Sequence, residues 1–200
     1  MDARSFAVAK TSPAVAAALM VAAGSTAAIL GALYFQYVLH YLPCPLCLMQ
    51  RYFHYAAIPL GLVVAGAAHY GAPRTLVRLG LVALALVLLG GAAVGVFHAG
   101  VEWKWWAGPQ DCSGPLNQLG GGNLLQQIET INVVRCDEAP WSFLGLSFAG
   151  WNVVISLALA GIAAFGAVAA GRDVVVQGRE IPARANPAGP GSLGRDSASR

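Results

Sequence analysis

Residues 75–101 read TLVRLGLVALALVLLGGAAVGVFHAGV, with Arg78 as the single charged side chain. A helix needs about 20 consecutive, mostly apolar residues to cross the hydrocarbon core of a bilayer, and this stretch is long enough. On either side of it, residues 14–42, 51–70 and 146–170 also qualify. All four stretches are rich in alanine, glycine, leucine and valine, and small residues let membrane helices pack closely.

The composition of the whole chain agrees with a membrane protein. Of its 200 residues, 57% are hydrophobic and 10% are charged, whereas soluble domains carry roughly 25% charged residues. A soluble core would need a more polar shell than these residues supply. The net charge of +3 gives no indication of nucleic-acid binding. We therefore expect an all-α membrane protein built as a four-helix transmembrane bundle.

The first apolar stretch could instead be a secretory signal. Its apolar run is longer than the core of such a signal, and no A-x-A cleavage site precedes a soluble domain. We therefore expect residues 14–42 to remain as the first span.

The positions of lysine and arginine predict the orientation, because basic residues favour the cytoplasmic side of short loops. Nine lie with the two termini and the turn between the second and third spans, and three lie on the other side. Residues 1–13 are then a cytoplasmic segment and residues 171–200 a cytoplasmic tail, which its composition predicts to be disordered. Residues 14–170 form the membrane domain, with outer loops at 43–50 and 102–145.

All four cysteines fall in the two outer loops. Cys44 and Cys47 lie in the short loop, and Cys112 and Cys136 lie in the long one. The compartment outside a bacterial inner membrane is oxidising. An even and wholly external set of cysteines therefore favours disulfide chemistry.

The short loop reads Tyr41-Leu-Pro-Cys44-Pro-Leu-Cys47-Leu-Met-Gln-Arg51. Proline lacks an N–H and ends helices, so the first span should stop here and Cys44 should lie in a turn. Two cysteines with two residues between them can close a readily exchanged ring, and such motifs often contain a cysteine of lowered pKa. A lone C-x-x-C fits either redox or metal use, but its place at the top of two spans favours redox.

Arg51 is expected one helical turn after Cys47. A charge close to the bilayer is costly, which makes it a functional candidate. Its guanidinium could stabilise a thiolate at Cys47 and donate hydrogen bonds to a quinone carbonyl. The alternative is an arginine that snorkels to the headgroups, and the neighbouring cysteine pair favours the functional role. Gln50 is a weaker candidate for the same pocket.

In the long loop, 23 residues separate Cys112 from Cys136, which fits neither a thioredoxin motif nor a compact zinc site. Glycines at 120–122 predict a hinge. Residues 123–134 have the apolar spacing of a short amphipathic helix with Asn123 as its N-cap. Such a helix could lie along the membrane surface or pack on the outer rim of the protein. A mobile loop suits a pair that must meet both a soluble partner and the first pair.

Histidine and tryptophan give weaker indications. His98 lies near the outer end of the third span, where it could contact a quinone or relay a proton, or have no role. The other histidines, His40, His54 and His69, are expected to be structural. Three tryptophans directly follow the third span and two frame the start of the fourth, and we expect all five to be interfacial anchors.

With these features in place, the sequence resembles the disulfide bond formation protein B (DsbB) family of bacterial inner-membrane oxidoreductases over about residues 14–170. The most specific element is Cys44-Pro-Leu-Cys47-Leu-Met-Gln-Arg51. The second is the segment from Cys136 to Leu146, CDEAPWSFLGL. The four cysteines also follow the family's order. One departure is the long, triple-glycine stretch between Cys112 and Cys136, which leaves the loop helix and the choice of partner open.

The resemblance implies an activity and a set of roles. A four-helix bundle would bind ubiquinone or menaquinone and reoxidise a periplasmic thioredoxin-fold dithiol oxidase of the DsbA type. Carried over by position, Cys47 is the quinone-proximal thiolate and Cys44 its partner. Cys112 is attacked by the partner protein, and Cys136 leaves and then attacks Cys44. Arg51 matches the arginine linked to the quinone, and His98 matches a histidine near it.

Other classes fit less well. A scaffold with zinc or structural disulfides could use four cysteines, and metal content would reveal it; we expect no metal. A reductase of the vitamin K epoxide type also combines four helices, C-x-x-C and quinone, but its loop pair precedes the C-x-x-C, whereas here it follows. A transporter or channel is disfavoured, because no span carries an acidic residue at mid-depth.

Overall fold

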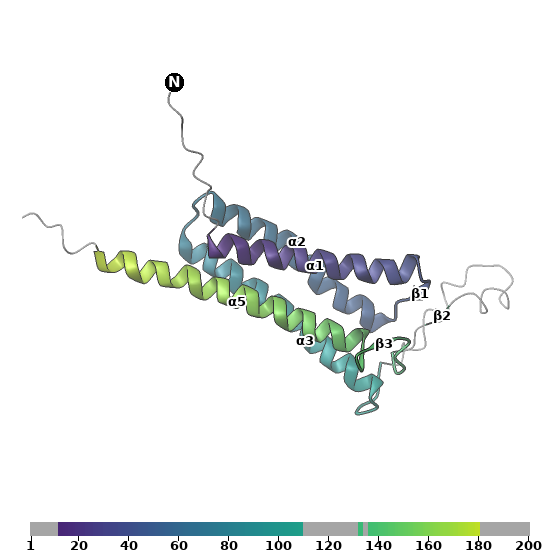
Figure 1. The fold of residues 1–200 in the computed structure, drawn as a ribbon. Coiled ribbons are helices and arrows are strands. Elements are labelled where there is room, and N and C mark those ends of the chain that lie inside the picture. Colours follow the sequence, from purple (N-terminus) through teal and green to yellow (C-terminus); the bar gives the residue numbers. More distant parts are fainter. Residues whose placement is uncertain (1–11, 110–131, 134–135, 181–200) are drawn as a thin grey trace, which may run out of the picture.

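The computed structural model describes residues 12–109, 132–133 and 136–180, with the backbone alone for 132–133 and 172–180. Its body consists of helices α1 (Pro13–Tyr37), α2 (Pro45–His69), α3 (Arg74–Glu102) and α5 (Phe148–Glu180). Strand β1 (Tyr41–Leu42) pairs in parallel with β2 (Asn132–Val133), and β3 (Ser142–Phe143) pairs antiparallel with β4 (Leu146–Ser147). The strands lie at one end of the bundle, and the start of α1 and the end of α5 lie at the other (Figure 1).

The four helices close into a bundle. Helix α1 packs against α2 and α5, and α3 also packs against α2 and α5, so α1 and α3 lie across the diagonal. The core is built from alanines with a few leucines, among them Ala18, Ala57, Leu84 and Ala163. At Gly61 of α2, a Cβ atom would lie 3.0 Å from the Ala18 carbonyl oxygen. Small residues therefore set how closely these helices approach.

Helices α1 and α2 each begin with a capping side chain followed by a proline. Ser12 caps α1 by accepting the Val15 N–H at 3.3 Å, and Pro13 follows at the first helical position. Cys44 caps α2 through its sulfur, and Pro45 follows in the same way. Proline is favoured there because its missing N–H has no partner within the helix.

The first helix is shorter than expected, because α1 ends at Tyr37 rather than at residue 42. Val38 is its C-cap, and His40 has a positive φ of 57° that a continuing helix does not allow. Tyr41 and Leu42 then pair with Asn132 and Val133 as an extended strand. Helix α2 begins at Pro45, close to the helix start near Cys47 on which the expected position of Arg51 depends and ahead of the apolar stretch 51–70.

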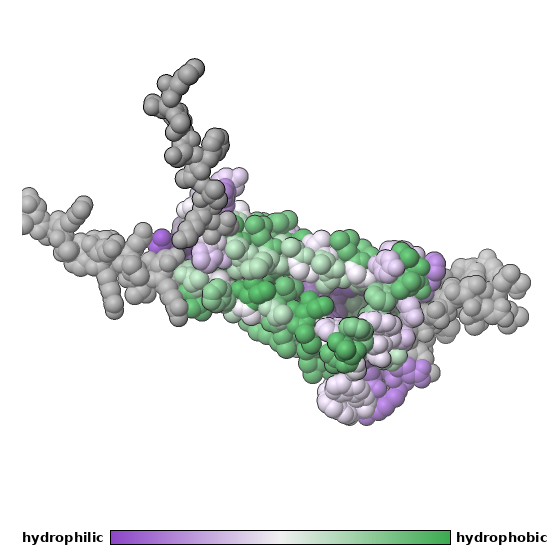
Figure 2. Space-filling view, viewed as in Figure 1, coloured by the Kyte–Doolittle hydropathy of each residue, from purple (hydrophilic) through white to green (hydrophobic). Residues whose placement is uncertain are grey.

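Three of the helices in the described part of the chain are long and apolar enough to cross a membrane: α1, α3 and Phe148–Gly171 of α5. Helix α2 is not among them, and its polar side chains include Gln50, Arg51 and His54. The structure thus confirms a mostly helical bundle typical of a membrane protein, while a fourth crossing by α2 stays a prediction. Large apolar side chains cover the outside of the bundle, including Leu30, Val63, Leu79, Leu86 and Phe165, and they give the helices a largely hydrophobic surface (Figure 2).

Helix α5 continues to Glu180, into the segment that the composition predicts to be a disordered tail. Adding residues to an existing helix is far less costly than starting one, so the helix extends beyond the apolar stretch. Residues 181–200 lie outside the described residues, as do 1–11. The predicted loop helix at 123–134 and the hinge at 120–122 also fall outside them, apart from the strand β2.

Candidate active site

The strand end of the bundle holds the C-x-x-C pair. Cys44 lies just before α2 with an extended backbone (φ −73°, ψ 165°), and its Sγ accepts the backbone N–H of Cys47 at 3.3 Å. The two sulfur atoms are 3.1 Å apart, and both cysteines are free thiols. A disulfide needs about 2.05 Å between its sulfurs. Closing the bond therefore needs only a small movement, and the site can alternate between dithiol and disulfide.

The two thiols are not equivalent. The pKa of Cys44 is lowered from 9.0 to about 5, first by its hydrogen bond with the Cys47 thiol and further by His98, against the opposing effect of burial. The pKa of Cys47 is raised, first by that same hydrogen bond and then by burial. A helix N-terminus also favours negative charge. In the dithiol state these shifts favour a thiolate at Cys44. The thiolate that the sequence suggested at Cys47 beside Arg51 stays a prediction.

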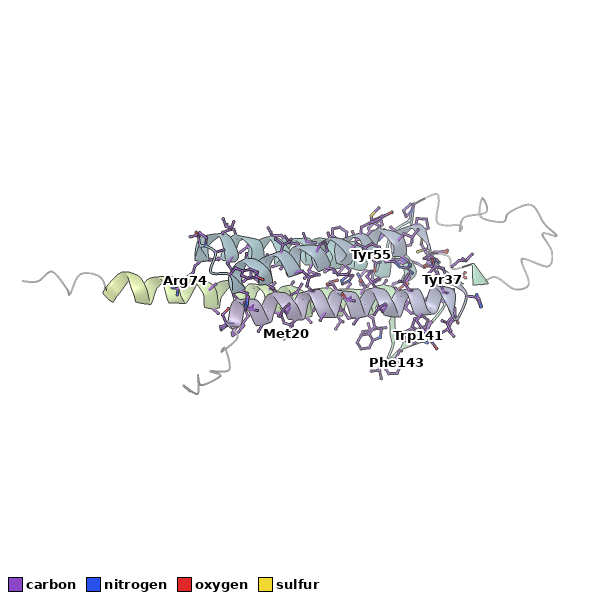
Figure 3. The ribbon with its side chains drawn as sticks, turned by 90° about the horizontal axis from the view of Figure 1, so that it is seen from above. Met20, Tyr37, Tyr55, Arg74, Trp141 and Phe143 are labelled. Atoms are coloured by element: carbon purple, nitrogen blue, oxygen red, sulfur yellow. The ribbon has the colours of Figure 1, made fainter. Side chains whose placement is uncertain are left out.

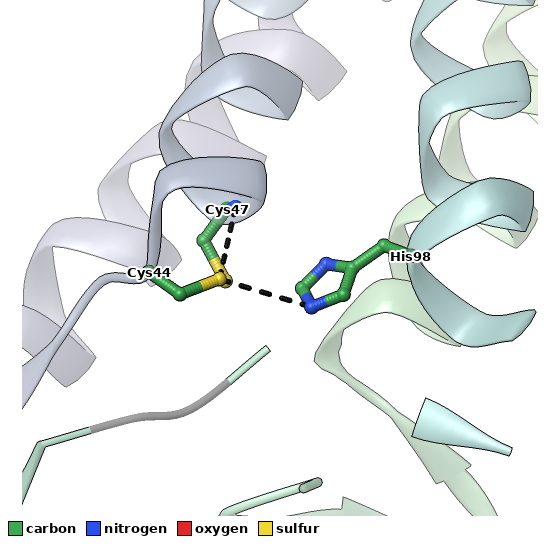
Figure 4. A group of neighbouring side chains, drawn as sticks. All are labelled: Cys44, Cys47 and His98. Atoms are coloured by element: carbon green, nitrogen blue, oxygen red, sulfur yellow. Dashed lines mark hydrogen bonds between the residues drawn. The ribbon is translucent and has the colours of Figure 1, made fainter. Parts of the chain in front are cut away.

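His98 and Gln50 complete the surroundings of Cys44. His98 of α3 is 2% exposed, and its Nε2 lies 3.7 Å from Cys44 Sγ (Figure 4). Its Nδ1 lies 2.8 Å from Gln50 Nε2. Both residues were singled out from the sequence as contacts of a cofactor, and the structure places them together at the dithiol. The ligand atoms of Cys44, Cys47 and His98 lie within 4.8 Å of one another, close enough to hold a metal ion as well.

Cys136 lies beside this pair. It is fully buried in one cluster with Cys44, Leu46 and Val101. The parallel β1–β2 pairing brings the chain just before Cys136 alongside the chain just before Cys44. Cys136 is disulfide-bonded. Its expected pairing with Cys112 stays a prediction, because Cys112 lies outside the described residues.

The end of α3 supplies residues that the sequence did not single out. Glu102 lies one turn after His98, with its Oε1 3.9 Å from His98 Nε2, and its side chain is 5% exposed. The hydroxyl of Ser147 donates a hydrogen bond to the other oxygen of Glu102. The spacing from His98 to Glu102 is a weak signal in the sequence, and nothing there connects Ser147 to either residue. Next to them, Lys104 donates to both the side chain and the backbone oxygen of Asp137.

A cavity of about 640 Å³ opens beside Cys47, between α1, α2 and α5. Its walls are mostly apolar, with an aromatic group formed by Phe35, Tyr41, Trp141, Phe143, Phe148 and Trp151. Trp141 and Phe143 lie at the strand end of the bundle, opposite Arg74 (Figure 3). The turn between β3 and β4, at Leu144 and Gly145, has two positive φ values (52° and 78°), as type I′ hairpin turns require. That hairpin brings its aromatic side chains to the cavity.

Polar side chains enter the cavity on one side, and they come mainly from α2. Cys47, Gln50, Arg51 and His54 all line it, together with Asn152 of α5. Arg51 donates to the side chain of Gln36 and, at 3.4 Å, to the carbonyl of Ala32. A guanidinium among apolar walls is therefore held inward by α1. This contact is specific, which a snorkelling arginine does not need.

His54 was expected to be structural, yet it lines this cavity. Its Nε2 lies 3.1 Å from Asn152 Oδ1, and its Nδ1 lies 3.3 Å from Ser25 Oγ. These polar groups from α1, α2 and α5 meet only in the folded bundle. His98, by contrast, is not among the residues that line the cavity. Its predicted contact with a quinone stays a prediction.

Comparisons with known proteins agree with one another. The family model described as "Disulfide bond formation protein DsbB" matches residues 14–166. Curated proteins named "Disulfide bond formation protein B" are similar to this chain. The protein from Aromatoleum aromaticum is 33% identical over 61% of this chain and 73% of its own length. The protein from Polaromonas naphthalenivorans is 32% identical over 68% and 80%, and that from Saccharophagus degradans is 35% identical over 72% and 87%.

Proposed function

This chain belongs to the disulfide bond formation protein B family, and on that basis we propose that it transfers electrons from a periplasmic protein dithiol to a membrane quinone. The protein dithiol would belong to a thioredoxin-fold oxidase of the DsbA type. The net reaction converts two protein thiols into a disulfide and reduces one quinone to a quinol, with two electrons and two protons moving between them. The chain would then be a quinone-dependent, disulfide-forming oxidoreductase.

The observation that carries the proposal is the position of the C-x-x-C pair. Cys44 packs against the disulfide-bonded Cys136 on one side, and Cys47 lines the cavity on the other. A pair placed between a second disulfide and an apolar cavity can accept electrons from the first and pass them to a ligand in the second. A structural disulfide would need no such cavity.

The roles of the thiols follow from thiol–disulfide exchange. A thiolate attacks one sulfur of a disulfide and displaces the other as a thiolate. We propose that the partner's thiolate attacks Cys112 and releases Cys136, which then attacks Cys44 in the Cys44–Cys47 disulfide. Cys47 leaves as a thiolate. The hydrogen bond and charge of Cys44 that raise the pKa of Cys47 no longer exist when Cys44 is disulfide-bonded, so the neighbouring Arg51 then acts on Cys47 without that opposition.

The cavity fits a quinone. A planar apolar ring suits the aromatic walls, and small-molecule sites are typically apolar with a few placed polar groups and volumes of roughly 300–1,000 Å³. Arg51 and Gln50 are the residues that we propose to hold its carbonyl groups, with His54 and Asn152 as further polar contacts. A bound quinone would accept the two electrons and two protons of the dithiol. Ubiquinone and menaquinone are both candidates.

We further propose that the strand end of the bundle faces the periplasm and that the protein lies in the bacterial inner membrane. The start of α1, the end of α5 and Arg74 lie at the opposite end, which fits the positive-inside rule. On the outer side, the cysteines meet an oxidising compartment and soluble partners.

The direct test is a coupled assay. Purified protein in detergent is mixed with a reduced thioredoxin-fold dithiol oxidase and ubiquinone or menaquinone, and quinone loss is followed by absorbance. We expect quinol and partner disulfide to form in equal amounts. Variants Cys44→Ser and Cys47→Ser should abolish both. Formation of partner disulfide without any loss of quinone would contradict the proposal.

A further inference from the structure

Two side chains, the thiol of Cys44 and the carboxylate of Glu102, approach the same nitrogen atom of His98 near the end of α3. His98 Nε2 lies 3.7 Å from Cys44 Sγ and 3.9 Å from Glu102 Oε1. The side chains of His98 and Glu102 are 3% and 5% exposed, and Cys44 is fully buried. A buried carboxylate is costly unless it has partners, and the hydroxyl of Ser147 together with His98 supplies them.

We propose that Glu102, held by Ser147, acts through His98 as the proton partner of Cys44. This role rests on the proposed redox function and adds a positioning residue to it. When the thiol of Cys44 loses its proton to His98 Nε2, a thiolate and an imidazolium form beside the carboxylate. The three groups carry a net charge of −1 before the transfer and −1 after it, so the buried site gains no net charge.

Gln50 can support this change from the other side of the ring. Its amide lies 2.8 Å from Nδ1, the other nitrogen of His98. A neutral imidazole carries one proton, so His98 can accept at Nε2 only when its own proton is on Nδ1. When the amide turns its oxygen toward the ring, Gln50 accepts from this N–H both before and after the transfer.

Other charged and titratable groups surround this centre in the described part of the chain. The Sγ atoms of Cys47 and Cys44 lie within hydrogen-bonding distance at 3.1 Å, and Arg51 acts on Cys47. Tyr41 of β1 packs against the cluster that contains Cys44. The Lys104–Asp137 pair is more exposed and pairs within itself. Glu102 is thus the carboxylate that approaches His98 closely.

Glu102 has a competing effect that makes the idea testable. Its negative charge repels a thiolate at Cys44 directly, but it favours an imidazolium at His98, which attracts that thiolate. Direct repulsion predicts that removing the charge of Glu102 makes Cys44 easier to ionise. Action through His98 predicts the opposite sign. His98 lies between the two acids at hydrogen-bonding range of Cys44, and we therefore expect its effect to exceed the repulsion.

The experiment uses the full chain with Cys47, Cys112 and Cys136 each replaced by serine, so that Cys44 is the single thiol. The rate of its alkylation by iodoacetamide is measured between pH 4 and pH 10 in detergent. No quinone or partner protein is present. Failure of this inference therefore leaves the proposed quinone reaction untouched, and failure of the quinone assay leaves the ionisation of Cys44 measurable.

In this background, Glu102→Gln should move the midpoint of the alkylation profile upward by about one pH unit, a roughly tenfold lower rate on the acid side. Glu102→Asp should restore part of the effect. Glu138→Gln makes the same change of charge at an exposed position of the same loop and should leave the midpoint in place. In a His98→Gln background, Glu102→Gln should no longer raise the midpoint, and the loss of direct repulsion should leave it equal or lower.

A midpoint that falls or stays with Glu102→Gln would overturn the inference, as would an equal upward shift in the absence of His98. Circular dichroism and thermal melting establish that each variant is folded. If Glu102→Gln does not fold, Ser147→Ala provides the test, because it removes the hydrogen bond to Glu102 and keeps the carboxylate. It should raise the midpoint by a smaller amount, and an unchanged midpoint there would count against the inference.

Discussion

Arg51 donates a hydrogen bond to the side chain of Gln36, and this contact joins α2 to α1 at the wall of the cavity. We expect Arg51→Ala to raise the KM for quinone by roughly 10- to 100-fold, because a hydrogen bond to a charged group contributes about 1.5–3 kcal/mol. Arg51→Lys should recover part of this, since an ammonium lacks the planar fork. Gln36→Ala, which leaves the cation in place, should have a smaller effect. Quinone kinetics measure all three, and an unchanged KM in folded Arg51→Ala would favour a snorkelling arginine.

The order of thiol exchange can be trapped. With Cys136→Ser, Cys112 has no cysteine of its own loop left to pair with, and it should capture an oxidised partner as a stable mixed disulfide. Non-reducing electrophoresis and peptide mapping identify the cysteine involved. The proposed order is wrong if the trapped partner is found on Cys44 or Cys47. It is also wrong if the loop pair of the unmodified protein stays intact during the reaction. The loop disulfide would then be structural.

The ion pair between Lys104 and Asp137 should affect how often Cys136 meets Cys44. Lys104 binds both the carboxylate and the backbone oxygen of the residue after Cys136. Lys104→Gln should slow transfer between the two cysteine pairs by up to about fivefold, since exposed pairs contribute about 0.2–1 kcal/mol. Asp137→Asn keeps the backbone contact and should slow it less. Rapid-quench analysis of Cys44–Cys136 formation measures the rate, and equal rates in both variants and the parent at low salt would argue against this role.

The low pKa of Cys44 predicts a pH dependence of stability in the reduced protein. The pKa is about 5 in the folded state against 9.0 for an ordinary thiol. The folded state therefore binds fewer protons than the unfolded state between these values, and stability should rise from pH 5 to pH 9. The contribution of the Cys44 thiolate to stability is lost as the pH falls through 5. Thermal unfolding of reduced and oxidised protein across this range provides the check, since the oxidised form has no Cys44 thiol and should lack this contribution.

The grouping of Cys44, Cys47 and His98 also permits a test of the metal alternative. We expect protein purified without chelators to contain less than stoichiometric zinc by elemental analysis. Its activity should be unchanged by dialysis against a chelator. One tightly bound zinc per chain, with both thiols protected from alkylation until the metal is removed, would support a zinc site instead of a redox pair.

Much of this architecture is predictable from the sequence, because it depends on local chemistry. Apolar length gives the helices, and Pro43 and Pro45 place Cys44 at a helix start. The spacing from Cys47 to Arg51 places the arginine one turn into α2, where it reaches the cavity. Such features are set by neighbours along the chain.

The remaining parts depend on contacts between distant segments. Ser147 reaches Glu102 across 45 residues, and His54 meets Asn152 across 98. A histidine in an apolar stretch gives no sign of which helix it will face. His54 therefore looked structural although it lines the cavity. For His98, the sequence left open a quinone contact, a proton relay or no role, and it did not indicate the neighbouring dithiol. The early end of α1 has the same origin, since the pairing of β1 with β2 is a long-range contact.

The modest apolarity of α2 has a consequence for biogenesis. An arginine costs about 2.5–3.5 kcal/mol at the centre of an inserting helix, and less toward its ends. Helix α2 places Arg51 in its second turn together with Gln50 and His54, so it gains little by entering a bilayer alone. Helix α1 is strongly apolar, is joined to α2 by a short connection, and supplies Gln36 and Ala32 as partners for Arg51. The two would enter the membrane as a hairpin during synthesis, and the residues proposed to hold the quinone would also help to bring the second helix in.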